Sequence, residues 1–169
     1  MSVTRQNGSV IASARIIPVV AVALFAVGSA GAASTPFDVV KGSWVGGGAL
    51  NFKDGRHETL SCNAYYTSSG GGEALTTALR CAGATDKFEL RSHLSYASGK
   101  VTGSWEERTF NASGEASGTL DPGNLRLNFH GGVAGSMTVA FSDKSQTVSI
   151  AITTAEVPVK GMHFDFKRN

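Results

Sequence analysis

The two cysteines of the sequence flank a run of three glycines, and this arrangement constrains the fold more than any other feature. Cys62 and Cys81 are the only cysteines, and the midpoint between them falls within glycines 70–72. A symmetric hairpin that turns at these glycines places the cysteines directly opposite each other on neighbouring strands, within the ~4.4–6.8 Å between Cα atoms that a disulfide requires. We therefore predict a disulfide-closed hairpin, which on the chain-entropy model stabilises the fold by roughly 3 kcal/mol.

Residues 1–33 have the three parts of a secretory signal peptide. Arg5 and Arg15 provide the positive charge, residues 16–27 are 12 uninterrupted apolar residues, and small residues follow at 28–33. The apolar run is shorter than the ~20 residues that a membrane-spanning helix needs. We expect cleavage after Ala33, with Ala32 as the alternative, and no membrane span in the mature protein. The protein is then exported, to the periplasm or as a secreted protein, where a disulfide persists.

Removal of the signal peptide changes the charge balance. The full chain has 15 Lys plus Arg and 13 Asp plus Glu, and both Arg5 and Arg15 leave with the signal peptide, so residues 34–169 carry 13 of each. A neutral domain has no basic surface to attract nucleic acid or an anionic membrane. We expect residues 34–169 to form a single monomeric domain without a nucleic-acid partner.

Apolar and polar side chains alternate with a period of two through almost all of this domain, and no window shows the 3.6-residue period of a helix. The predicted strands are 44–52, 57–67, 75–81, 87–98, 101–110, 116–120, 125–130, 136–141, 147–153 and 159–167. Residues 34–40 are expected to form a loose arm and residues 111–115 a turn. The pattern predicts an all-β antiparallel meander that closes into a single small barrel, since closure removes exposed sheet edges. A two-sheet β-sandwich is the alternative.

The Gly-Ser-Trp at positions 42–44 resembles the Gly-x-Trp signature of calycin-type barrels, the lipocalins and avidins. In those barrels the glycine lets the chain curl across the closed end and the tryptophan plugs that end. An arginine from the last strand often stacks on the tryptophan, so the resemblance implies this role for Arg168, with Lys167 as the alternative. Gly-Ser-Trp recurs at 103–105, and we expect both tryptophans to be largely buried. The whole chain also looks like small exported bacterial proteins of unassigned function.

The candidate catalytic groups have simpler interpretations. The four histidines are predicted to point outward from separate strands, unlike the converging ligands of a zinc site. Glu58 and Glu107 are predicted to point inward, where a carboxylate pair can perform acid–base chemistry. The interpretation we favour is that both lie at strand ends, in water or beside Arg80 or Arg108. The sequence has no nucleophile elbow or histidine-backed serine. We therefore expect no cofactor, no metal site and no enzymatic activity.

The predicted interior differs between the two halves of the chain. The C-terminal strands contribute only hydrocarbon, whereas the N-terminal strands contribute small residues, aromatic rings and hydroxyls. Such a mixture either packs into a filled core, which is the simpler expectation, or leaves a pocket with a few polar groups. A pocket indicates binding of a small apolar ligand, and a filled core indicates an envelope protein-interaction or inhibitor module. The candidate ligand-binding residues are Trp44, Tyr66, Thr77, Ser92, Tyr96, Trp105 and Glu107.

Overall fold

The structure is a computed structural model that describes residues 1–2 and 36–169. The predicted signal peptide, apart from its first two residues, and its cleavage site lie outside the described residues. Among the residues that the structure describes, no helix is long and apolar enough to cross a membrane.

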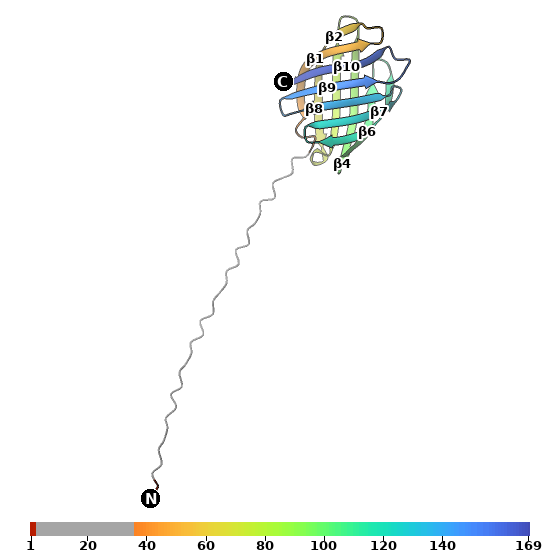
Figure 1. The fold of residues 1–169 in the computed structure, drawn as a ribbon. Helices are drawn as coiled ribbons and strands as arrows, with labels where there is room; N and C mark the ends of the chain where they lie inside the picture. Colours follow the sequence, from red (N-terminus) through yellow and green to blue (C-terminus); the bar gives the residue numbers. More distant parts are fainter. Residues whose placement is uncertain (3–35) are drawn as a thin grey trace. The chain divides into compact units, whose positions relative to one another are not determined.

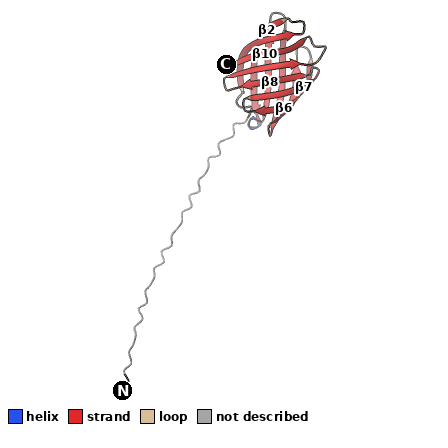
Figure 2. Ribbon diagram, in the orientation of Figure 1, coloured by secondary structure: helices blue, strands red, loops and turns tan. Residues whose placement is uncertain are grey.

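Ten antiparallel strands form one closed barrel, in which each strand pairs with its neighbours in the sequence (Figures 1 and 2). The ring closes where β1 (Gly42–Phe52) pairs with β10 (Val159–Arg168). The strands between them are β2 (His57–Ser69), β3 (Ala74–Ala82), β4 (Lys87–Ala97), β5 (Lys100–Glu107), β6 (Ala112–Asp121), β7 (Asn124–Gly131), β8 (Gly135–Phe141) and β9 (Ser145–Ile152). The predicted all-β meander barrel is confirmed, and the alternative of a β-sandwich is wrong.

The β2–β3 hairpin has the register predicted from the cysteines. Cys62 and Cys81 are directly paired and joined by a disulfide, with their Cα atoms 4.1 Å apart, slightly closer than expected. The chain reverses through the short 3-10 turn η1 (Gly70–Gly72), in which all three residues have positive φ. Glycine is required there because a side chain disfavours that backbone conformation. The glycine run therefore sets the register that brings the cysteines together.

The up-and-down order of the strands defines two ends of the barrel. Odd-numbered strands begin at one end, which we call the closed end, and run to the other, which we call the mouth. The mouth consists of the connections at residues 53–56, 83–86, 108–111, 132–134 and 153–158. The closed end carries η1, the other connections, residues 36–41 and Asn169. The two ends differ in how they are covered.

Residues 36–40 cover the closed end. Phe37 and Val40 are buried, and the Phe37 amide donates to the carbonyl oxygen of Gly72 at 3.3 Å. The expectation of a loose arm over residues 34–40 is therefore wrong for its described part. These apolar side chains belong to no strand, so alternation did not reveal that they pack inward. The segment is joined to Trp44, whose Nε1 donates a hydrogen bond to the carbonyl oxygen of Val40 at 2.8 Å.

The connection between β5 and β6 lies earlier than predicted. It spans residues 108–111, whereas a turn was expected at 111–115. The carboxylate of Glu107 accepts hydrogen bonds from the backbone amides of Thr109 and Phe110, at 3.0 and 2.6 Å, and these bonds fix the chain reversal there. β6 can then begin at Ala112, and Gly114 is paired with Trp105. The small, polar composition of this strand looked like a turn, although the residues alternate between the two faces.

Candidate functional site

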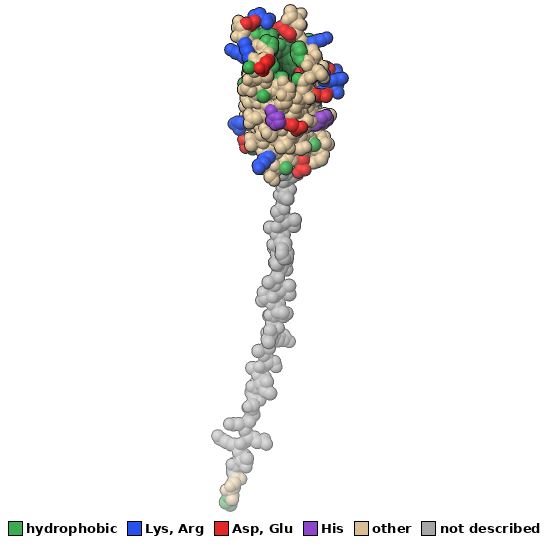
Figure 3. Space-filling model, turned by 90° about the vertical axis from the view of Figure 1, so that its right-hand side faces the viewer, with side chains coloured by type: hydrophobic (Ala, Val, Ile, Leu, Met, Phe, Trp, Pro, Cys, Tyr) green, Lys and Arg blue, Asp and Glu red, His purple; other side chains and the backbone are tan. Residues whose placement is uncertain are grey.

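The barrel encloses a cavity of about 770 Å³ that opens at the mouth. Its lining is almost entirely hydrocarbon, contributed by every strand and by Phe37 and Val40 at the closed end. Figure 3 shows, toward the top of the barrel, a hollow lined with hydrophobic side chains and bordered by charged ones. The simpler expectation, a filled core, is wrong. A ring of ten strands is wide enough to leave an interior that the inward side chains do not fill.

Five of the seven predicted ligand-binding residues line this cavity, and four of these form one continuous row. Tyr66 on β2 is paired with Thr77 on β3, Thr77 with Ser92 on β4, and Ser92 with Trp105 on β5. Because paired residues on neighbouring strands point to the same face of a sheet, all four side chains lie on the same inner wall. The row therefore gives an otherwise apolar wall a band of hydrogen-bonding groups.

Two hydroxyl groups of the row bond to each other, and a third is left for a ligand. The Oγ1 atom of Thr77 and the Oγ atom of Ser92 are 2.8 Å apart. The Tyr66 hydroxyl has no hydrogen-bond partner among the described residues. Burial raises the pKa of Tyr66 to about 12, since the phenolate loses its hydration inside the barrel. The phenol therefore stays protonated at physiological pH and can donate a hydrogen bond into the cavity.

Trp44 is fully buried as predicted, and Trp105 is partly buried and packed against the core. Its ring faces the cavity and packs edge-on against Phe129, with 5.9 Å between ring centroids. The indole Nε1 is buried without a hydrogen-bond partner among the described residues. Gly114 on β6 and Gly131 on β7 continue the row without side chains.

Trp44 and Tyr96, the other two aromatic candidates, do not line the cavity. Trp44 is 1% exposed and belongs to the closed end, as the Gly-x-Trp resemblance implied. Tyr96 packs edge-on against Phe37, with 6.4 Å between ring centroids. Both rings therefore support the floor of the cavity from outside. A ligand in the cavity meets the row from Tyr66 to Trp105 instead.

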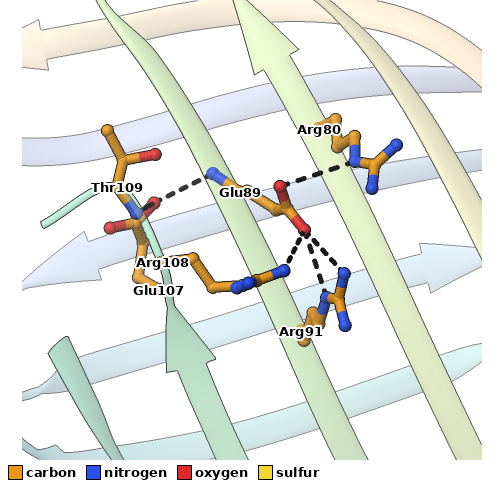
Figure 4. Close-up of polar contacts among 6 residues, drawn as sticks. All are labelled: Arg80, Glu89, Arg91, Glu107, Arg108 and Thr109. Atoms are coloured by element: carbon orange, nitrogen blue, oxygen red, sulfur yellow. Dashed lines mark hydrogen bonds and ion pairs between the residues drawn. The ribbon is translucent and has the colours of Figure 1, made fainter. Parts of the chain in front are cut away.

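Glu107, the fifth predicted residue in the lining, stands at the mouth with its carboxylate already bonded. Its Oε1 accepts from the amides of Glu89 and Thr109 at 2.9 and 3.0 Å (Figure 4). Its Oε2 accepts from the amide of Phe110 at 2.6 Å. It does not bond to Arg108, which instead lies 3.3 Å from the carboxylate of Glu89 on the outer face. Arg80 and Arg91 also pair with Glu89 there (Figure 4). Glu107 thus shapes the mouth, and a ligand has to compete with three amides for it.

Glu58, the other carboxylate considered for acid–base chemistry, is hydrogen-bonded to the mouth connection at residues 83–86. It accepts hydrogen bonds from the hydroxyl and amide of Thr85 and from the amide of Asp86, at 2.5, 2.8 and 2.9 Å. The Thr85 hydroxyl and then these amides lower the pKa of Glu58 to about 2, since they favour the charged carboxylate. A carboxylate of such low pKa is a poor general base at neutral pH. Both carboxylates lie at strand ends, as the favoured interpretation expected, but they bond to the mouth connections and not to Arg80 or Arg108.

One residue of the lining was missed by the sequence reasoning. Gln146, the second residue of β9, is 2% exposed and is the one buried polar side chain among the described residues. It lines the closed end of the cavity, and its amide nitrogen has no hydrogen-bond partner in the part that the structure describes. The available signal was its spacing, because Gln146 is in phase with Val148 and Ile150. The predicted strand began at residue 147, so this inward position was not recognised.

The histidines are placed as predicted. His57, His93, His130 and His163 are exposed on the outer surface of four different strands. Within residues 1–2 and 36–169, no three His, Cys, Asp or Glu side chains are grouped to hold a metal ion.

Comparison with known proteins identifies the fold and not a family. No protein-family model matches the sequence, and no curated protein matches it. Solved structures with a similar fold include the following two. Rv2717c from M. tuberculosis has a TM-score of 0.63 and 14% identity, covering 78% of this chain and 93% of its own. The S-type phycobiliprotein lyase CPES from Guillardia theta has a TM-score of 0.58 and 13% identity, covering 79% of this chain and 90% of its own. Both are calycin-like barrels, which supports the predicted resemblance for the fold.

Proposed function

We propose that this protein binds a small, mostly apolar ligand inside its barrel. The cavity of about 770 Å³ is the observation that carries the proposal, because it is large enough for a small organic molecule and is lined mainly by hydrocarbon. Transfer of an apolar ligand from water into such a lining is favourable by roughly 25 cal/mol per Å² of buried apolar surface. The band formed by Tyr66, Thr77, Ser92 and Trp105 supplies the few polar contacts that orient it.

The distribution of charge supports capture by burial and not by electrostatic attraction. The charged residues of the lining are Asp86, Lys87, Glu107 and Glu156, and all four lie at the mouth. They include one base and three acids, so they offer no concentrated positive charge to an anionic ligand. Binding is then only weakly dependent on salt concentration.

Binding, and not catalysis, is the activity that we propose. The two carboxylates considered for acid–base chemistry, Glu58 and Glu107, each accept three hydrogen bonds from groups at the mouth. The alternative of a protein-interaction or inhibitor module rested on a filled core, and the open cavity favours the ligand-binding protein over it.

We also propose that the protein is exported and acts as a monomer without a nucleic-acid partner. The signal-peptide pattern of residues 1–33 supports export, and the Cys62–Cys81 disulfide is compatible with an oxidising compartment. The balanced charge of residues 34–169 provides no attraction for polyanions.

Native mass spectrometry of the protein purified from its own host tests the proposed function. We expect a species heavier than the mature chain that loses a small apolar molecule on denaturation. A parallel screen of apolar compounds should raise the melting temperature as ligand excess increases. A bare chain mass, together with no shift by any compound of the screen, would show that the cavity does not serve ligand binding.

A further inference from the structure

Gln146 places an unsatisfied amide at the closed end of the cavity. The residue is 2% exposed, and its nitrogen lacks a hydrogen-bond partner among the described residues. Buried amides are almost always hydrogen-bonded, so each exception requires an explanation. Rotation about the last side-chain bond exchanges the nitrogen and the oxygen, and the amide can therefore offer a donor or an acceptor. Either orientation leaves Gln146 with hydrogen-bonding capacity that a molecule in the cavity can use.

The position of Gln146 in the barrel is at the closed end of the cavity. It is the second residue of β9, which begins at the closed end, and it is paired with Phe166 and Phe141. In the closed ring of ten strands, β9 and β4 are five strands apart in either direction. In strand order, Gln146 therefore lies on the side of the ring opposite Ser92, which stands in the middle of β4. A head group at the closed end can meet the amide of Gln146, while the hydroxyls of the row lie on the other wall.

The polar groups in this part of the cavity are uncharged. Among the described residues that line the cavity, every charged side chain belongs to the mouth, whereas Gln146, Tyr66, Thr77 and Ser92 are neutral. Arg168 is near the closed end, but it stacks on Trp44 outside the lining and donates to backbone carbonyls. A carboxylate or phosphate placed there would lose its hydration without meeting a positive charge. A hydroxyl or amide head group meets no such penalty.

We propose that the ligand has an uncharged head group, a hydroxyl or an amide, that enters the barrel first and bonds to Gln146 while its apolar body extends toward the mouth. This inference rests on the proposed function and specifies the chemical class and the orientation of the ligand. An anionic amphiphile would have to bind in the reverse direction, with its head at the mouth beside Lys87. The two orientations are distinguished by the head group that the protein prefers.

The test is competition of three probes of equal chain length, decanol, decane and decanoate, against the neutral dye Nile red. The variant is Gln146→Met, which removes the amide and keeps the length of the side chain. The matched control is Ile150→Met, on the same strand and face and also in the lining, where no polar atom is removed. Wild-type protein and the control should prefer decanol to decane by about fivefold to tenfold, as expected for one neutral hydrogen bond. In Gln146→Met this preference should disappear while the affinity for decane is kept.

Each other result has a distinct meaning. If Nile red binds but Gln146→Met retains the preference for decanol, the role of Gln146 is wrong and the proposed ligand-binding function stands. A preference for decanoate that weakens with salt places the head group at the mouth and overturns the inference in the same way. If neither Nile red nor any of the three probes binds to the folded wild-type protein, the proposed function fails and the inference with it.

Discussion

The guanidinium carbon of Arg168 lies 4.4 Å from the centroid of the Trp44 indole, and these two residues are paired in register across the seam where the last strand meets the first. Arg168 also donates hydrogen bonds to the backbone carbonyls of Val39, in the segment that covers the closed end, and of Lys41, which follows that segment. A single side chain therefore links the barrel seam, the buried tryptophan and the covering segment. This contact keeps the closed end shut beneath the cavity.

Replacement of Arg168 by alanine should lower the free energy of unfolding by about 2 kcal/mol, because it removes a cation–π contact and several charge-assisted hydrogen bonds. Urea denaturation of the mature domain measures this change. Lys167→Ala is the control, since Lys167 is exposed on the other face of β10. An equal loss in the two variants would mean that the stacked arginine has no particular role.

Replacement of both Cys62 and Cys81 by serine should lower the free energy of unfolding by roughly 3 kcal/mol on the chain-entropy model. The bond closes a loop with a sequence separation of 19, and the register of the hairpin does not depend on it because η1 fixes the turn. The far-ultraviolet circular dichroism of the folded variant should therefore be unchanged. Reaction of both thiols of the exported wild-type protein with a label, under denaturing and non-reducing conditions, would contradict the disulfide.

Much of the barrel could be predicted because its determinants are local. The period-two alternation and the turn residues specify the strands, and the position of glycines 70–72 relative to the cysteines specifies one register. The covering of the closed end by residues 36–40 could not be predicted in this way. Phe37 and Val40 have no periodic neighbours, and their burial depends on the space left at the end of the closed ring.

The candidate site was predictable only in part, for a related reason. Alternation identifies the side chains that face inward, and it placed Tyr66, Thr77, Ser92 and Trp105 on one wall. It does not tell whether inward side chains fill the interior, because that depends on the number of strands and on the diameter of the ring. Gln146 was missed at a strand boundary, where periodic patterns are least informative.

Acid should destabilise the mouth through Glu58. The pKa of this carboxyl is about 2 in the folded protein, against an ordinary value of 4.5. A depressed folded-state pKa contributes stability that is present above the ordinary value and is lost as the pH falls toward the folded value. The melting temperature of Glu58→Gln should therefore fall less than that of the wild type between about pH 5 and pH 2. The exposed Glu115→Gln is the control, and a wild-type-like pH profile for Glu58→Gln would refute this explanation.

The Gln146→Met variant, freed of ligand, should be more stable than the wild type by about 1–2 kcal/mol. The substitution removes a buried amide nitrogen that lacks a partner, and the penalty for such a group is lost with it. Differential scanning calorimetry of the ligand-free protein measures the change, with Ile150→Met as the control for the new thioether. A loss of stability would indicate that buried water satisfies the amide. A gain in stability would show that the unpaired amide of Gln146 destabilises the ligand-free protein, as expected for a group that is satisfied only when a ligand binds.

Contact quenching should distinguish the two tryptophans. Trp105 lines the cavity and is half-buried, whereas Trp44 lies outside the lining and is shielded by Arg168 and Val40. A brominated alcohol such as bromodecanol quenches only an indole that it touches. In Trp44→Phe, where Trp105 remains, we expect strong quenching that excess decanol reverses; in Trp105→Phe, where Trp44 remains, we expect little. Equal quenching of both variants would place the probe on the outer surface, because from within the cavity it can reach only one of the two rings.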